Sequence, residues 1–211
     1  MTYLVKEIFY SLQGEGVRTG RAAVFCRFVG CNLWSGREID RVSARCNFCD
    51  THFLDSPDCM ARRFLDPGQL ADTVATVWPK KQKGHRYVIC TGGEPLLQLD
   101  IPLLEAFHAH HFEIAVETNG SLPVPNEVDW ICVSPKAGVA LVQTHGNELK
   151  LVYPQKNADP KDFEDLPFTY FFLQPMDGPL LQYHTDLAVK YCLDHPLWRL
   201  SLQIHKYLQI S

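Results

Sequence analysis

The stretch that decides the fold is Tyr87-Val88-Ile89-Cys90-Thr91-Gly92-Gly93-Glu94-Pro95, in a chain of 211 residues. It begins as a continuous apolar run, which is typical of a strand buried on both faces. Two glycines and a proline then mark a turn, and glycines at a strand end let a ligand approach the backbone closely. The stretch therefore predicts a buried strand that runs into a ligand-binding turn.

Further apolar runs of strand length lie along the chain, and helical patterns separate several of them. The runs are Ala22–Val29, Phe112–Val116, Trp130–Val133, Leu149–Tyr153, Phe168–Leu173 and Leu200–Ile204. Helices are predicted after Asp66-Pro67 and Asp100, which can serve as N-caps, and over 180–191. Alternating strands and helices predict an α/β fold with a mostly parallel sheet or barrel. No repeat or linker divides the sequence, so we predict a single domain over 1–211.

Polar and glycine-containing turns follow the predicted strands. They are Gly30-Cys31, Glu117-Thr118-Asn119-Gly120, Ser134-Pro135-Lys136 and Gln174-Pro175-Met176-Asp177. In parallel sheets and barrels, ligands bind beyond the carboxyl ends of the strands. We therefore expect the functional site at this edge.

Charge and hydropathy exclude several classes of protein. The net charge is −4, whereas proteins that bind nucleic acid or anionic membranes usually carry a basic excess. The N-terminal segment lacks a basic region followed by an apolar run, and no apolar run is long enough to cross a membrane. These observations predict a cytoplasmic protein that binds neither nucleic acid nor membrane.

The eight cysteines fall into two groups. Cys26, Cys90 and Cys132 lie inside apolar runs, where a thiol behaves as a small hydrophobic side chain. Cys59 and Cys192 lack any partner pattern. We expect these five to be structural.

Cys31, Cys46 and Cys49 lie in a polar, glycine-containing stretch. Cys46 and Cys49 form a CxxC motif, and 14 residues separate Cys31 from Cys46. Thiolates favour an iron–sulfur cluster or zinc. A structural zinc site needs four ligands, and His52 or Cys59 could be the fourth, whereas a cluster on three cysteines leaves one iron open. The Gly92-Gly93 turn could hold an amino-acid ammonium group beside that iron, which favours the cluster.

Taken in order, the motifs resemble the 7-carboxy-7-deazaguanine synthase family of the radical S-adenosylmethionine (SAM) superfamily over nearly the whole chain. The stretches that carry the resemblance are Phe9–Gly16, Phe25–Phe28, Gly30–Trp34, Cys49–Thr51, Thr91–Pro95, Glu117–Gly120, Ser134–Lys136, Gln174–Asp177 and Leu202–Leu208. In the superfamily the first two cysteines are usually separated by three residues. The longer spacing here is known in some members, and it leaves residues 32–45 without an assigned role.

The resemblance implies a fold, a reaction and a set of cofactors. The fold is a partial (β/α) barrel with a modified radical SAM core, a substrate-binding N-terminal segment and a C-terminal tail. The reaction contracts the ring of 6-carboxy-5,6,7,8-tetrahydropterin to give 7-carboxy-7-deazaguanine with loss of ammonia, a step toward queuosine. It uses a 4Fe-4S cluster on Cys31, Cys46 and Cys49, S-adenosylmethionine, and Mg²⁺ on Thr51. A homodimer and an external electron donor such as flavodoxin or ferredoxin are also implied.

The same resemblance assigns the remaining site residues. The substrate-binding residues are Leu12, Gln13, Gly14, Glu15, Arg27, Thr91 and His205. The cofactor-binding residues are Phe48, Cys49, Asp50, Gly93, Glu117, Ser134, Pro135, Lys136, Gln174, Pro175, Met176 and Asp177. Arg27 also has a physical argument, because an unpaired charge among apolar strand residues is costly and a guanidinium binds a carboxylate through two hydrogen bonds.

Two alternatives remain at this stage. One is an activase of the same superfamily that places a glycyl radical on a partner protein. The other is a zinc-stabilised binding module in which Cys31, Cys46, Cys49 and His52 hold the metal.

Overall fold

The computed structural model describes residues 2–54, 61–80 and 84–210, which contain a nine-stranded sheet in the order β3-β1-β2-β4-β5-β6-β7-β8-β9. The strands are β1 (Tyr3–Leu12), β2 (Ala22–Phe28), β3 (Arg62–Phe64), β4 (Arg86–Gly92), β5 (Phe112–Thr118), β6 (Trp130–Val133), β7 (Gly146–Tyr153), β8 (Phe168–Pro175) and β9 (Trp198–Leu200). The α-helices are α1 (Pro67–Val77), α2 (Ile101–Ala109), α3 (Leu181–Asp194) and α4 (Ile204–Leu208), and short 3-10 helices are η1 (Glu38–Ser43), η2 (Pro95–Leu97) and η3 (Pro160–Phe163).

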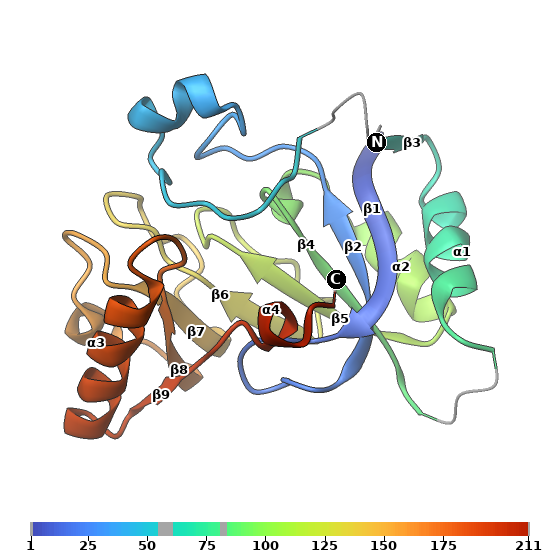
Figure 1. The fold of residues 1–211 in the computed structure, drawn as a ribbon. Coiled ribbons are helices and arrows are strands. Elements are labelled where there is room, and N and C mark those ends of the chain that lie inside the picture. Colours follow the sequence, from blue (N-terminus) through green and yellow to red (C-terminus); the bar gives the residue numbers. More distant parts are fainter. Residues whose placement is uncertain (1, 55–60, 81–83, 211) are drawn as a thin grey trace.

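The sheet is mostly parallel. Strands β2 and β4 to β9 run parallel to one another, whereas β1 is antiparallel to both of its neighbours, β2 and β3. Helices α1 and α2 pack at one end of the curved sheet and α3 packs against β8 and β9 at the other, as Figure 1 shows. The prediction of an α/β partial barrel is confirmed.

The predicted helix starts are found where local chemistry places them. The Asp66 carboxylate accepts a hydrogen bond from the Gln69 amide, 2.9 Å away, and Pro67 occupies the first helical turn. Asp100 caps α2 in the same way, through the Leu103 amide. Both helices then bury apolar faces against the sheet.

The first strand was not predicted from the sequence. Residues 3–12 mix apolar side chains with Lys6 and Glu7, and only Tyr3 and Val5 of this strand are fully buried. A half-exposed antiparallel strand has this alternation, and it is less visible than a continuous apolar run. The N-terminal segment therefore belongs to the sheet.

The last predicted strand, Leu200–Ile204, is wrong in its bounds. The strand ends at Leu200, and the chain then turns toward the interior, where the Ile204 amide donates to the Gly14 carbonyl at 3.0 Å. Residues 204–208 form α4, which Figure 1 shows lying across the open face of the sheet. Gln203, His205 and Lys206 of this last segment line the cavity described below, and the segment does not extend the sheet.

The amino-terminal end of the barrel interior is closed by the loop between β1 and β2. Arg18 and Arg21 both pair with Glu113 of β5. The Arg18 guanidinium also lies 3.9 Å from the ring centre of Trp130, and that of Arg21 lies 4.0 Å from the ring centre of Tyr87. This leaves the opposite end, at the carboxyl ends of the strands, open for a ligand.

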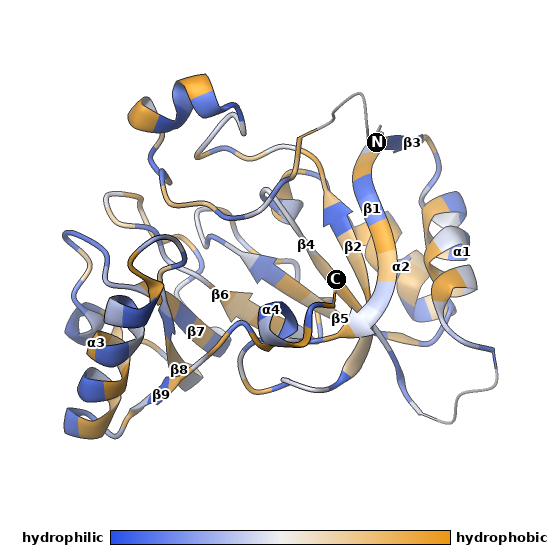
Figure 2. Cartoon of the chain, in the orientation of Figure 1, coloured by the Kyte–Doolittle hydropathy of each residue, from blue (hydrophilic) through white to orange (hydrophobic). Residues whose placement is uncertain are grey.

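The hydropathy of the residues differs between the core of the sheet and the strand ends that face the cavity. Hydrophobic residues dominate the central strands in Figure 2, and the arrowhead of β2 is hydrophilic. Cys26 and Cys90 are fully buried in the core, as expected, and Cys192 packs against a second apolar cluster around β7, β8 and α3. Cys132 is also buried, but its side chain faces the cavity described below. Cys59 lies outside the described residues.

None of the helices in the described part of the chain is both long enough and apolar enough to cross a membrane.

Candidate active site

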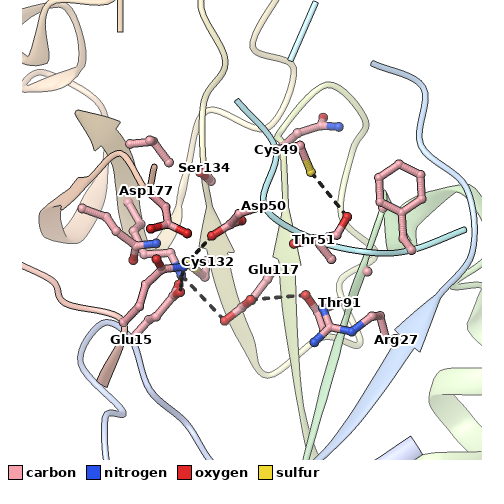
Figure 3. A pocket seen from close by; sticks show the side chains of 18 of the residues that line it. Glu15, Arg27, Cys49, Asp50, Thr51, Thr91, Glu117, Cys132, Ser134 and Asp177 are labelled. Atoms are coloured by element: carbon pink, nitrogen blue, oxygen red, sulfur yellow. Dashed lines mark hydrogen bonds and ion pairs between the residues drawn. The ribbon is translucent and has the colours of Figure 1, made fainter. Parts of the chain in front are cut away.

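A cavity of about 390 Å³ opens at the carboxyl ends of the parallel strands, the edge that the sequence predicted. Its walls include every predicted substrate residue: Leu12, Gln13, Gly14, Glu15, Arg27, Thr91 and His205. They also include Cys31, Cys46, Cys49 and Thr51, and the predicted cofactor residues Phe48, Asp50, Gly93, Glu117, Ser134, Lys136, Gln174, Pro175 and Asp177. Figure 3 shows 18 of the lining side chains arranged around this space, ten of them labelled.

Pro135 and Met176 do not line the cavity. The Pro135 carbonyl accepts from the Gln155 side chain, and the Met176 amide and carbonyl bond to Tyr153 and His184. The backbone groups of these two residues hold the strand ends in place, and their side chains lie outside the cavity lining. Their predicted contact with a cofactor has no support in this geometry.

The three cysteines reach the cavity from two segments. Cys31 follows β2, and Cys46 and Cys49 lie in the loop after η1. The hydrogen bond between Cys46 and Cys49 lowers the pKa of the Cys49 thiol to about 6 and raises the pKa of Cys46. The Leu33 amide points at the Cys31 sulfur, 3.4 Å away. The lowered pKa of Cys49 favours its thiolate, the form that binds metal, whereas burial raises the pKa of Cys31 despite its amide donors.

The donor set fits an iron–sulfur cluster better than a single ion. Within residues 2–54, 61–80 and 84–210, no three His, Cys, Asp or Glu side chains are grouped closely enough for one metal ion. A closed zinc site on Cys31, Cys46, Cys49 and His52 is therefore not formed. A four-iron cluster is larger than one ion, and three thiolates on the wall of an open cavity can hold it while leaving one iron exposed.

The glycines after β4 are required by the backbone beside them. A Cβ on Gly93 would lie 2.0 Å from the Gly30 carbonyl oxygen, and one on Gly92 would lie 2.2 Å from that of Phe28. The amides of Gly93 and Glu94 donate to the carbonyls of Phe28 and Gly30. The turn is therefore bonded to the segment that carries Cys31.

Glu94 has a structural role in the same turn. Its carboxylate is fully buried and accepts from the Leu96 amide, the Thr118 hydroxyl and the Asn119 amide. Burial raises its pKa, although these donors oppose that shift. The residue ties the end of β4 to the end of β5, so both strands present their final residues to the same cavity.

Three charged residues form the polar floor of the cavity: Glu15, Glu117 and Lys150. Lys150 pairs with Glu15, and its Nζ lies 3.8 Å from Glu117. The Gln13 amide donates to Glu117 at 2.9 Å, and the Gln203 amide donates to Glu15 at 3.1 Å. Figure 3 shows Glu15 and Glu117 on the same side of the cavity. Lys150 was not among the predicted site residues, although a lysine inside a predicted buried strand is a signal of a paired charge.

Arg27 faces the cavity from β2, but it is not unpaired. Its Nε donates to Glu7 of β1 at 2.6 Å, and the antiparallel register places these two residues opposite each other. Phe9 and Phe25 stack beside it with ring centres 5.1 Å apart. The expectation that Arg27 would be unpaired without a ligand is therefore wrong, because Glu7 is its partner. Its remaining guanidinium donors still line the cavity.

The C-terminal tail closes one side of the site. Lys206 binds Asp50, which follows Cys49, and Asp177, which follows β8. The Gln203 amide also donates to Asp50 at 2.8 Å. Burial by itself raises the pKa of Asp50, but the hydrogen bonds from Gln203 and Lys206 outweigh this effect, so the pKa is lowered. A Cβ on Gly14 would lie 2.3 Å from His205 Nδ1, so the N-terminal loop and the tail are in direct contact.

Known proteins match this chain at the level of fold and of sequence. The Radical SAM superfamily matches residues 43–147, and the fold and the three-cysteine site define a radical SAM enzyme. The chain is 59% identical to the 7-carboxy-7-deazaguanine synthase of Burkholderia multivorans over 100% of both chains, and 57% identical to that of Bradyrhizobium diazoefficiens over the same shares. The crystal structure of QueE from Escherichia coli has the same fold, with a TM-score of 0.68 over 96% of this chain and 94% of that one, at 24% identity. The chain belongs to the 7-carboxy-7-deazaguanine synthase family.

Proposed function

We propose that this chain converts 6-carboxy-5,6,7,8-tetrahydropterin to 7-carboxy-7-deazaguanine with loss of ammonia, a step toward queuosine and other deazapurines. The observation that carries the proposal is that possible cluster ligands and possible substrate-binding groups line one cavity. Three cysteines suited to a cluster lie on its wall, and Gln13, Glu15 and Glu117 bring hydrogen-bonding groups into the same cavity. Family membership favours this reaction over glycyl-radical activation.

The cysteines are the cluster ligands in this proposal. With S-adenosylmethionine bound, a 4Fe-4S cluster supplies one-electron cleavage of a carbon–sulfur bond, and so a carbon radical that can abstract hydrogen from the substrate. Phe48, Asp50, Gly93, Ser134, Lys136 and Asp177 line the part of the wall assigned to that cofactor. Trp34 and Phe53 pack edge to face beside it with ring centres 5.6 Å apart, and both are buried, so they exclude water from the cysteine side.

The pterin is held by groups that match its two ends. A pterin presents N–H donors along its ring edges and a carboxylate at carbon 6. The carboxylates of Glu15 and Glu117 can accept from the ring donors, and Arg27 can donate to the substrate carboxylate. Thr91, which lies 3.3 Å from Glu117, orients that carboxylate. Such a fixed set of partners places one carbon of the substrate for hydrogen abstraction.

Magnesium on Thr51 belongs to the same proposal. One hydroxyl, the substrate carboxylate and several waters would complete the octahedral oxygen shell that Mg²⁺ prefers. The Thr51 side chain lines the cavity next to the cysteine loop, as Figure 3 shows. A Thr51→Ala variant that kept the full response of turnover to added Mg²⁺ would remove this residue from the metal site.

The remaining parts of the proposal concern the setting of the enzyme. We place it in the cytoplasm as a homodimer that receives electrons from a small donor such as flavodoxin or ferredoxin. The free cysteines among the described residues support a reducing compartment.

The experiment is anaerobic reconstitution with iron and sulfide, followed by incubation with S-adenosylmethionine, a reductant and 6-carboxy-5,6,7,8-tetrahydropterin. We expect 7-carboxy-7-deazaguanine and ammonia in equal amounts, and no product when S-adenosylmethionine is left out. A fully reconstituted protein that cleaves S-adenosylmethionine but leaves the pterin unchanged would overturn the proposed function.

A further inference from the structure

Lys150 is a buried cation between two carboxylates on the floor of the cavity. It lies on β7, with 7% of its side chain exposed. Its neighbours on the same face of the strand are Glu148 and Val152, so the side chain points into the barrel. A lysine in this position is costly to bury unless it is paired.

The partners of Lys150 come from the two other elements that bind the pterin in the proposed function. Glu15 reaches it from the loop after β1, and Glu117 reaches it from the end of β5. Each carboxylate has a further amide donor, Gln203 for Glu15 and Gln13 for Glu117. These contacts fix both carboxylates in the cavity before any substrate binds.

We propose that Lys150 is a positioning residue for the substrate, because it holds Glu15 and Glu117 together as two charged acceptors for the N–H edge of the pterin ring. The inference rests on the proposed function and extends it to a residue with no assigned role. Lys150 acts through the two carboxylates. It is therefore not a catalytic residue.

The chemistry of the ring edge requires both carboxylates to be ionised. An ionised carboxylate only accepts hydrogen bonds, whereas a protonated one carries a donor that opposes a ring N–H. Two carboxylates that share a buried site repel each other, and without a cation one of them takes up a proton. Lys150 supplies the positive charge that lets both remain acceptors.

The charged groups around Glu117 agree with this role. Burial by itself raises the pKa of Glu117, but Lys150, Gln13, Arg27 and Thr91 outweigh it, and the pKa is lowered. Cys132 of β6 and Glu148 of β7 also face this group of charges. Burial likewise opposes the charge of Lys150, and Glu117 and Glu15 reverse that effect, so the pKa of Lys150 is raised.

The inference predicts a specific dependence of substrate affinity on pH. A carboxylate acceptor is present above its pKa and is lost as the pH falls through it. With Lys150 present, the pKa of Glu117 is below its usual range, so affinity should hold through neutral pH. Without the lysine charge, burial and Glu15 both raise that pKa, and affinity should fall as the solution becomes mildly acidic.

The test measures the dissociation constant of 6-carboxy-5,6,7,8-tetrahydropterin in the reconstituted enzyme with S-adenosylmethionine and no reductant. The variants are Lys150→Gln, which keeps hydrogen-bond donors without charge, Lys150→Met, which removes both, and Lys150→Arg, which keeps the charge. Lys190→Gln, at an exposed position of α3, is the matched control. The ratio of variant to wild-type constants is compared from about pH 6 to about pH 8.5, so that ionisation of the substrate itself cancels.

We expect both neutral variants to bind the pterin at least tenfold more weakly at the acidic end, with the ratio falling by up to about tenfold per pH unit toward alkaline pH. Lys150→Arg, which keeps the charge, should show a ratio that does not change with pH, and Lys190→Gln should match wild type at every pH. The two neutral variants differ in size and polarity, so one that fails to fold leaves the other to decide.

A constant ratio across pH in a folded neutral variant would overturn the inference alone, because it would make Lys150 a merely structural residue. Absence of pterin binding by wild-type enzyme would instead overturn the proposed function, and the inference with it. Carbon-13 titration of the glutamate carboxyls in wild type and Lys150→Gln shows whether the lysine sets their charge, independently of any substrate.

Discussion

Arg27 is a side chain at the site with one donor already paired and others still available. Its Nε is occupied by Glu7, and its remaining donors face the cavity. The bond to Glu7 fixes the plane of the guanidinium, which lowers the entropy lost when a carboxylate binds to it. The residue is therefore held ready for a ligand by a neighbour on the adjacent strand.

Replacing Arg27 by lysine should weaken substrate binding while leaving the cofactor side untouched. Lysine keeps the charge but loses the planar pair of donors, and one charged hydrogen bond is worth about 1.5–3 kcal/mol, or roughly 10- to 100-fold in affinity. We expect KM for the pterin to rise by that factor, with uncoupled cleavage of S-adenosylmethionine unchanged. Arg199→Lys on β9, outside the cavity walls, is the control, and an Arg27→Lys enzyme with normal KM would make Arg27 a purely structural partner of Glu7.

The three cysteines should be individually essential. A cluster that lacks one thiolate loses both an anchor and the ligand set that determines its potential. We expect Cys31→Ala, Cys46→Ala and Cys49→Ala each to lose the brown colour after reconstitution, together with cleavage of S-adenosylmethionine. Cys192→Ala, which alters a thiol on α3 that is not among the residues lining the cavity, should keep both properties. Full activity in any of the first three variants would contradict the assignment of the cluster ligands.

At the scale of elements, the turn after β4 links the cofactor side of the site to the sheet. Gly93 lies against the backbone of Gly30, next to the first cysteine, and Glu94 ties the turn to the end of β5. Each contact is between main chain and main chain or between a buried carboxylate and its donors. The position of Cys31 thus depends on a turn that is distant from it in sequence.

The contact predicts a large effect of Gly93→Ala. A methyl group 2.0 Å from a carbonyl oxygen cannot be accommodated without moving either β4 or the Cys31 segment. We expect a loss of about 1–3 kcal/mol in the free energy of unfolding, measured with denaturant, and incomplete loading of iron. Gly68→Ala, in the first turn of α1, is the control. There the added Cβ lies 3.0 Å from the Asp66 carboxylate, which can shift, and equal stability of the two variants would contradict this account.

The elements also show what can be predicted from sequence. Buried parallel strands such as β4 and β5 were visible because both of their faces are apolar, and α1 was visible because Asp66 and Pro67 mark its start. Strand β1 was missed because its exposed face carries charge. Residues 200–204 were assigned to a strand because they contain several apolar residues, although β9 ends at Leu200 and α4 begins at Ile204. The strand-end motifs located the cavity, but Lys150 and the Arg27–Glu7 pair depend on neighbours from other strands, which no local pattern contains.

At the scale of the whole molecule, the barrel has a closed end and an open end. The β1–β2 loop takes part in both. Its Arg18 and Arg21 close the amino-terminal end, and its Gln13 and Glu15 line the cavity that opens at the other end. The closed end is held by Glu113. Burial by itself raises the pKa of Glu113, but the hydrogen bonds and charges of Arg21 and Arg18 outweigh it, so the pKa is lowered.

This arrangement predicts a pH-dependent contribution of Glu113 to stability. Because the folded-state pKa is depressed, the contribution is present above the unfolded-state pKa and is lost as the pH falls through the folded-state pKa. We expect Glu113→Gln to lower the free energy of unfolding by about 2 kcal/mol at neutral pH, with the difference from wild type shrinking below about pH 4. The exposed Glu105→Gln on α2 should show no such trend, and a difference that is constant with pH would mean that packing, rather than charge, closes this end.

The contact between the N-terminal loop and the tail has a consequence for how the enzyme is made in the cell. Glu15 and Gln203 meet at the cavity although 188 positions separate them in the chain. The ribosome must therefore synthesise the tail before the cavity can contain both Glu15 and Gln203. Strands β1 and β2 can pair early during translation, but the cavity is complete only after synthesis has passed Lys206.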